Sequence, residues 1–263
     1  MEILNLLLLG IVAGTLAGLL GVGGGIIIVP ALVWIFHSHA EIPAASLMHI
    51  AIGTSLATIV ITSISSMIAH HRRGAVLWSI VWQLAPSIIV GALLGALIAD
   101  ALPSETLRKI FAIFILLVSA QLGFLAPPAP HRQLPGSVAT WSITGTLIGK
   151  VSALMGIGGG SLTVPFLVWC NISIRNAVAT SAACGFPIAL SGALGFIATG
   201  RHIDGAWMSG YIYWPAFIAI SPATLLFAPL GAKLAHTLPV NTLKKLFAVF
   251  LAGVGVNMLI MGK

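Results

Sequence analysis

The chain has 263 residues, of which 59% are hydrophobic and only 6% are charged, and its mean hydropathy is +1.10. No water-soluble domain with a polar surface has this composition, so an integral membrane protein is predicted. The net charge of +7 comes from twelve Lys and Arg residues against five Asp and Glu residues. Most of these cations fall in short loops, where they meet lipid phosphates or attract anions, and they form no patch typical of nucleic-acid binding.

A membrane-spanning helix needs about 20 apolar residues, so the chain is predicted to be all-α with about eight hydrophobic segments. The first, residues 3–36, is too long for one straight crossing, and the glycine cluster at 21–25 divides it into two helical pieces. The fifth, residues 137–169, is broken in the same way at residues 156–160. The other predicted spans are residues 46–69, 76–99, 106–125, 177–199, 207–235 and 242–261.

The two glycine clusters are copies of each other. The run from Gly21 to Pro30 reappears from Gly156 to Pro165, at a shift of 135 in the numbering (156 − 21). Further matches occur at shifts of 126 and 136: Gly53-Thr54-Ser55 with Ala179-Thr180-Ser181, Pro86 with Pro222, and Leu102-Pro103 with Leu238-Pro239. This pattern indicates an internal duplication, with one repeat in residues 1–125, a proline-rich linker in 126–136 and a second repeat in 137–263.

The repeats are parallel if each broken segment crosses the membrane, and inverted if each turns back on itself. With Lys150 set aside as intramembrane, full crossings divide the other eleven cations 5 to 6, and re-entrant segments divide them 4 to 7. Because cytoplasmic loops usually hold the excess of cations, inverted repeats with both termini outside are favoured.

A helix break inside the bilayer is tolerated only where protein or a water-filled cavity covers the free backbone groups. Glycines let another group approach the backbone closely, and successive N–H groups can bind an anion. Close packing of helices would also explain glycines, but packing needs them spaced by four rather than in a run. The glycines are therefore predicted to form an anion site, as in transporters whose half-helices meet at the midplane: Gly23, Gly24, Gly25, Gly158, Gly159 and Gly160.

Several polar side chains are predicted to complete this site. The hydroxyls of Thr54, Ser55, Thr180 and Ser181 can hold an oxyanion, although such hydroxyls also bond to their own helix. Ser161 lies beside the second break. Lys150, six residues before Gly156, either counters the anion or extends to the membrane surface.

No catalytic residue, metal or cofactor is predicted. The carboxylates lie at ends or loops, so proton coupling would need a histidine, of which His49 is best placed, or the substrate's own proton. The histidines lack partners at zinc-ligand spacing, and Cys184 is interpreted as a small hydrophobic residue or a reactive thiol. An intramembrane serine protease using Ser161 would need a buried histidine, and no second-half span supplies one.

The paired motifs from Gly21 to Pro30 and from Gly156 to Pro165, each followed by a Thr-Ser span, resemble the TauE/SafE family of sulfite and organosulfonate exporters. The resemblance covers nearly the whole chain and carries over the glycine clusters, Pro30 and Pro165. Ser161 and Lys150 depart from the symmetry of the two halves. The resemblance implies a multi-pass secondary transporter of the bacterial inner membrane that exports small sulfur-containing anions.

The expected mechanism is alternating access around a midplane anion, with membrane lipids and a coupling ion, proton or sodium, as the other partners. An anion channel built on the same site is the alternative. The sequence leaves open the substrate, the coupling ion, the transport direction and the oligomeric state.

Overall fold

The structure is a computed structural model that describes residues 2–20, 24–37, 42–124, 135–203, 205–234 and 240–260. The first half contains α1 (Glu2–Leu20), α2 (Gly25–Phe36), a 3-10 turn η1 (Ala44–Ser46), α3 (Leu47–Arg72), α4 (Trp78–Asp100) and α5 (Ser104–Phe124). The second half contains α6 (Val138–Met155), α7 (Gly160–Trp169), α8 (Ile174–Thr199), η2 (Gly200–His202), β1 (Met208–Ser209), β2 (Ile212–Tyr213), α9 (Trp214–Leu234) and α10 (Val240–Ile260).

The described chain is almost entirely helical, as predicted. Four helical stretches within it are long and apolar enough to cross a membrane: Ala44–Arg72, Trp78–Asp100, Ser104–Phe124 and Ile174–His202. Large apolar side chains on the outer helix faces are exposed, for example Trp82 at 70%, Leu97 at 57% and Leu117 at 65%. Such faces are stable against lipid and not against water, so the protein is a multi-pass membrane protein.

Both predicted helix breaks are present. The helix α1 ends at Leu20 and α2 begins at Gly25, and α6 ends at Met155 before α7 begins at Gly160. Gly23 lies outside the described residues. The helix α5 begins at Ser104, two residues before the predicted span.

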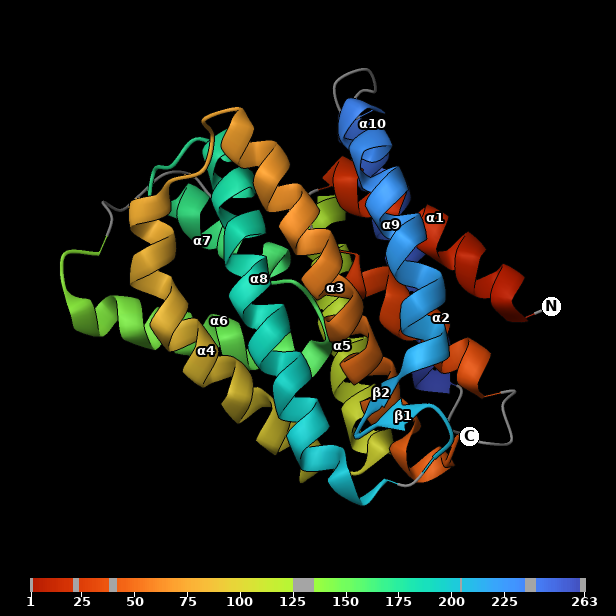
Figure 1. Cartoon of the computed structure of the whole chain (residues 1–263). Coiled ribbons are helices and arrows are strands. Elements are labelled where there is room, and N and C mark those ends of the chain that lie inside the picture. The colour runs from red at the N-terminus through yellow and green to blue at the C-terminus, as the bar shows by residue number, and fades with distance from the viewer. Residues whose placement is uncertain are drawn as a thin grey trace.

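The helices of the two halves are interleaved, so the halves do not form separate bodies. Figure 1 shows α3 and α8 side by side at the centre, with α4 packed on α6 to one side and α1 packed on α9 to the other. The helices α5 and α10 also pack together, and α4 lies against α8. Apolar side chains of α2 and α3 flank the second break: a Cβ atom at Gly156 would lie 2.9 Å from Val29 Cγ2 and 3.3 Å from Ile52 Cγ2.

The predicted span at residues 207–235 was wrong at its start. Residues Met208–Ser209 and Ile212–Tyr213 pair as a short antiparallel hairpin, and α9 begins only at Trp214. Gly210, with a φ of 58°, takes the first position of the two-residue turn. The hydropathy of this stretch continues that of α9, so hydropathy alone could not place the boundary.

Thr54 and Thr180 hold the connections that precede α9 and α4. Thr54 Oγ1 accepts a hydrogen bond from the Tyr213 backbone N–H at 3.0 Å, and Thr180 Oγ1 accepts one from the Leu77 N–H at 3.1 Å. Both threonines are fully buried. Each hydroxyl therefore satisfies a backbone donor of a connecting segment from the other half of the chain.

We expect Thr54→Val to lower the free energy of unfolding by about 1–3 kcal/mol, because it leaves the Tyr213 N–H without its acceptor. Thr58→Val is the matched control: the Thr58 hydroxyl donates only to the Thr54 carbonyl of its own helix, so its loss should cost less. Thermal unfolding in detergent measures both. Equal losses in the two variants would contradict the assigned role of Thr54.

Candidate functional site

The start of α2 and the second glycine break are in direct contact. A Cβ atom at Gly25 would collide with the carbonyl oxygen of Gly156 and would lie 3.0 Å from Ile157 Cα. Ser55 of α3 donates a hydrogen bond from its Oγ to the same Gly156 carbonyl at 2.9 Å. The described end of the first break and the second break therefore meet in the protein interior.

The backbone of the second break explains its glycines. Gly156 ends α6 in the left-handed conformation, with a φ of 66°, and the N–H groups of Gly156 and Ile157 bond back to the Ala153 and Ser152 carbonyls. Gly159, with a φ of 78°, caps the start of α7 without a side-chain hydrogen bond. The first N–H groups of a helix have no intrahelical acceptor, so α7 offers donors and a positive helix end at this point.

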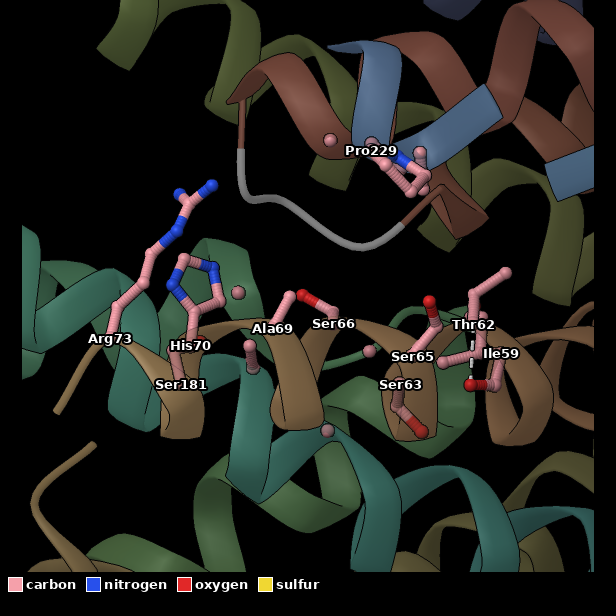
Figure 2. Close-up of a pocket in the computed structure, with 17 residues that line it drawn as sticks. Ile59, Thr62, Ser63, Ser65, Ser66, Ala69, His70, Arg73, Ser181 and Pro229 are labelled. Carbon is pink, nitrogen blue, oxygen red and sulfur yellow. Dashed lines mark hydrogen bonds between the residues drawn. The ribbon is translucent and has the colours of Figure 1, made fainter. Parts of the chain in front are cut away.

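A cavity of about 150 Å³ reaches the second break. Figure 2 shows its wall on α3, where Thr62, Ser65, Ser66, His70 and Arg73 follow one another along the helix, with Pro229 of α9 on the opposite side. The remaining lining residues come from α1, α3, the second break, α8 and α9: Ala17, Gly18, Ile59, Ser63, Ala69, Gly158, Gly160, Ser181, Ala182, Gly185 and Ala228.

The mouth of the cavity is positively charged. Arg73 lines the cavity and is exposed at the end of α3. No carboxylate side chain lines the cavity among the described residues. An anion therefore meets favourable charge at the mouth and neutral donors further in.

Three of the residues predicted from the sequence line this cavity: Gly158, Gly160 and Ser181. Gly25 lies at the contact between the breaks described above, and Gly24 caps α2, where an added Cβ would lie 3.6 Å from Ala17 Cβ. Gly159 packs against Ile188. The glycines at 24, 25 and 159 shape the backbone around the cavity without lining it.

Thr54, Ser55, Thr180 and Lys150 do not line the cavity. The two threonines and Ser55 are already engaged in the hydrogen bonds given above. Lys150 lies half-buried on α6, where its carbonyl oxygen packs against Gly95 of α4. The structure thus places the three hydroxyls, and the backbone of Lys150, at helix contacts instead of at the cavity surface.

Four buried hydroxyls near the second break have no hydrogen-bond partner: Ser152, Ser161, Thr163 and Ser181. A buried hydroxyl without a partner costs free energy, and a polar ligand or water removes that cost. Of the four, Ser181 also lines the cavity. The described residues contain no group of three or more His, Cys, Asp or Glu that could hold a metal ion.

The polar wall of α3 was not predicted from the sequence. Ser63 and Ser66 are most simply interpreted as helix contacts, and Arg73 as a loop cation, when each is taken alone. The signal lies in their spacing, because Thr62, Ser66, His70 and Arg73 recur every three or four residues and so share one helix face. A polar face on a membrane-spanning helix indicates a water-filled path.

Comparison with known proteins identifies the family. The family model "Sulfite exporter TauE/SafE" matches residues 6–258. A "probable membrane transporter protein" of Haemophilus influenzae is 40% identical over 258 residues, which cover 97% of each chain. The "probable membrane transporter protein YunE" of Bacillus subtilis is 28% identical, over 100% of this chain and 99% of its own.

No solved structure matches the chain. The relatives are named as transporters and not as enzymes, which agrees with the expectation of a protein without catalytic residues. The chain belongs to the TauE/SafE family of membrane transporters.

Proposed function

We propose that the protein exports small sulfur-containing anions, such as sulfite or organosulfonates, across the bacterial inner membrane by alternating access. The anion site is the cavity at the second glycine break. The observation that carries this proposal is the combination, in one cavity, of Gly158, Gly160 and the unpartnered Ser181 hydroxyl with Arg73 at the mouth. Sulfite and sulfonate groups present three oxygens, which suits several weak donors better than a single lysine.

The proposed mechanism uses two inverted repeats, and the contacts between helices support this arrangement. The packing of α4 on α6 is matched by that of α9 on α1, as expected when the two halves exchange places about a two-fold axis. The bonds from Tyr213 to Thr54 and from Leu77 to Thr180 form another such pair, because Tyr213 matches Leu77 at the shift of 136 (213 − 77).

The charges support a cavity that opens to the cytoplasm. Among the described side chains at that end of the helices, the cations are Arg72, Arg73, Arg175 and Lys245, and there are no carboxylates. The opposite end carries Arg108, Lys109 and Arg201 together with Asp100 and Glu105. Because cytoplasmic ends hold the excess of Lys and Arg, the mouth faces inward, where an exporter loads its substrate.

We expect Arg73→Ala to weaken anion binding by about tenfold, because it removes the positive charge at the mouth. Arg72→Ala is the matched control: Arg72 lines a neighbouring apolar groove with Ile68 and Leu225 and does not line the cavity. The measurement is saturable sulfite flux into inside-out vesicles, with added salt expected to reduce the difference between the two variants.

Equal flux in the two arginine variants would contradict a substrate site in this cavity. Flux that does not saturate and does not depend on a proton or sodium gradient would indicate a channel instead. Saturable flux of carboxylates but not of sulfite or sulfonates would overturn the proposed substrate class.

A further inference from the structure

The β1–β2 hairpin is an insertion in the second half of the chain. Ser181 matches Ser55 at a shift of 126, whereas Pro222 matches Pro86 at a shift of 136, so the second half contains ten more residues between these points (136 − 126). In the first half, only residues 73–77 connect α3 to α4, beside the open cavity. In the second half, the corresponding connection carries the hairpin, at the opposite ends of the helices.

Tyr211, in the hairpin turn, joins three helices from both halves. Its side chain is 3% exposed, and its hydroxyl donates a hydrogen bond to Asp100 Oδ1, at the end of α4, at 2.8 Å. Its ring stacks on His49 of α3 with centroids 4.9 Å apart, and meets Phe196 of α8 edge-on at 6.0 Å. Burial, and then the bond to Asp100, raises the pKa of Tyr211, so the phenol keeps the proton that it donates.

The hairpin backbone is also tightly seated. A Cβ atom at Gly53 of α3 would lie 2.5 Å from the Tyr211 carbonyl oxygen, and one at Gly200 would lie 2.6 Å from the Tyr211 nitrogen. The Tyr211 N–H bonds to the Phe196 carbonyl at 3.2 Å. The turn is therefore packed directly against the backbones of α3 and of the end of α8.

The residues that correspond to the cavity wall lie on α3 and α8 within about one helical turn of Gly53 and Phe196, which contact the hairpin, and they are closed. Ser66, Ala69 and Ala182 line the cavity, and the shift of 126 relates them to Gly192, Gly195 and Leu56. A Cβ atom at Gly192 would lie 3.0 Å from Leu56 Cδ1, and one at Gly195 would lie 2.6 Å from Ala96 Cβ.

Two buried polar atoms close to this region have no partner: His49 Nδ1, whose ring stacks on Tyr211, and Ser152 Oγ, which lies beside Gly159 at the second break. Ser152 matches Ala17, which lines the cavity, at the shift of 135 (152 − 17). Buried polar atoms without hydrogen-bond partners do not stabilise a purely structural contact. In a path that fills with water in another conformation, water would hydrate these atoms. The closed face thus has the features of the cavity in its shut form.

We propose that the β1–β2 hairpin is the gate of the substrate path on the side opposite to the cavity, and that the Tyr211–Asp100 hydrogen bond must break for that side to open. This inference rests on the alternating-access function proposed above. It assigns the hairpin a role that has no counterpart at the first-half connection, residues 73–77, beside which the cavity is open.

The test measures access to Leu56, which is fully buried on the closed face. Leu56→Cys is placed in a background with Cys170→Ala and Cys184→Ala, which removes both native cysteines. A membrane-impermeant maleimide is then applied from each side of oriented vesicles. We expect Tyr211→Phe to speed labelling from the side opposite to the cavity by about tenfold or more, because it removes a hydrogen bond to a charged group and leaves the ring in place.

Asp100→Ala should give the same increase, because it removes the bond from the other partner. Ser209→Ala is the matched control: its hydroxyl accepts a bond from Trp214 Nε1 next to the hairpin and makes no bond to α4, so the labelling rate should stay unchanged. Size-exclusion profiles and thermal unfolding confirm that each variant is folded.

Unchanged labelling in folded Tyr211→Phe and Asp100→Ala would overturn the gate. Equal increases in Ser209→Ala, or equal increases from both sides, would also overturn it, since they would show general loosening of the fold. The labelling needs no substrate. Absence of anion flux in the wild-type protein would therefore refute the proposed function. The labelling rates would still test the gate.

Discussion

Gly25→Ala is expected to lower the free energy of unfolding by about 3 kcal/mol and to abolish transport, because overpacking against backbone is costlier than against a flexible side chain. The added Cβ would collide with the Gly156 carbonyl oxygen and press on Ile59 Cδ1 at 2.9 Å. The Gly156 carbonyl cannot move away easily, because it belongs to the turn that ends α6. It also already accepts a hydrogen bond from the Ser55 hydroxyl.

A loss of this size corresponds to a fall of roughly 6–12 °C in the melting temperature. Gly253→Ala provides the control, because a Cβ at Gly253 of α10 meets nothing within 4 Å. That variant should gain about 0.5–1 kcal/mol from the better helix propensity of alanine. If Gly25→Ala unfolds at the wild-type temperature, the two breaks are not packed together as described.

Ser181→Phe is expected to abolish anion flux while leaving the protein folded in the membrane. Ser181 is 1% exposed and borders the cavity, so a phenyl ring at this position would occupy much of the space of about 150 Å³. The flux of sulfite into vesicles should fall by at least about 100-fold, because an anion cannot share the cavity with the ring. Insertion and size-exclusion behaviour should remain those of the wild type.

Two alanine variants separate the loss of a ligand donor from the loss of a structural bond. Ser181→Ala removes a hydroxyl without a protein partner, so flux should fall about tenfold at unchanged stability. Ser119→Ala removes a hydroxyl that donates to the Ala248 carbonyl at 2.7 Å, so stability should fall by about 1 kcal/mol at unchanged flux. The reverse pattern would place the substrate away from Ser181.

Each of the proposed variants tests a different part of the transport path. The contact between Gly25 and Gly156 sets the position of α2 against the second break, and Ser181 provides a donor in the cavity that the break borders. Arg73 provides charge at the mouth, and Tyr211 closes the opposite side. A transporter needs all of these functions from a chain with very few charged residues, which is why glycines, hydroxyls and backbone groups carry so much of the site.

The sequence was sufficient for the helical membrane class, for the family and for the positions of both helix breaks. Composition fixes the class, because a chain this apolar has to bury its backbone hydrogen bonds in helices. The positions of the breaks could be predicted because a continuous helix has no need of several glycines in a row. The motifs that recur between the two halves also pointed to Ser181 and to the glycines of the second break.

The roles of individual side chains depended on contacts between distant segments. Thr54 and Ser181 are both hydroxyl-bearing residues of long helices, yet Thr54 caps the Tyr213 N–H and Ser181 borders the cavity. Residues Met208–Tyr213 have the hydropathy of a membrane span. They form a hairpin instead, because they pack between α3 and α8. Local pattern determines which segments enter the membrane; which hydroxyls remain available to a ligand is determined by the donors and acceptors that other helices bring to them.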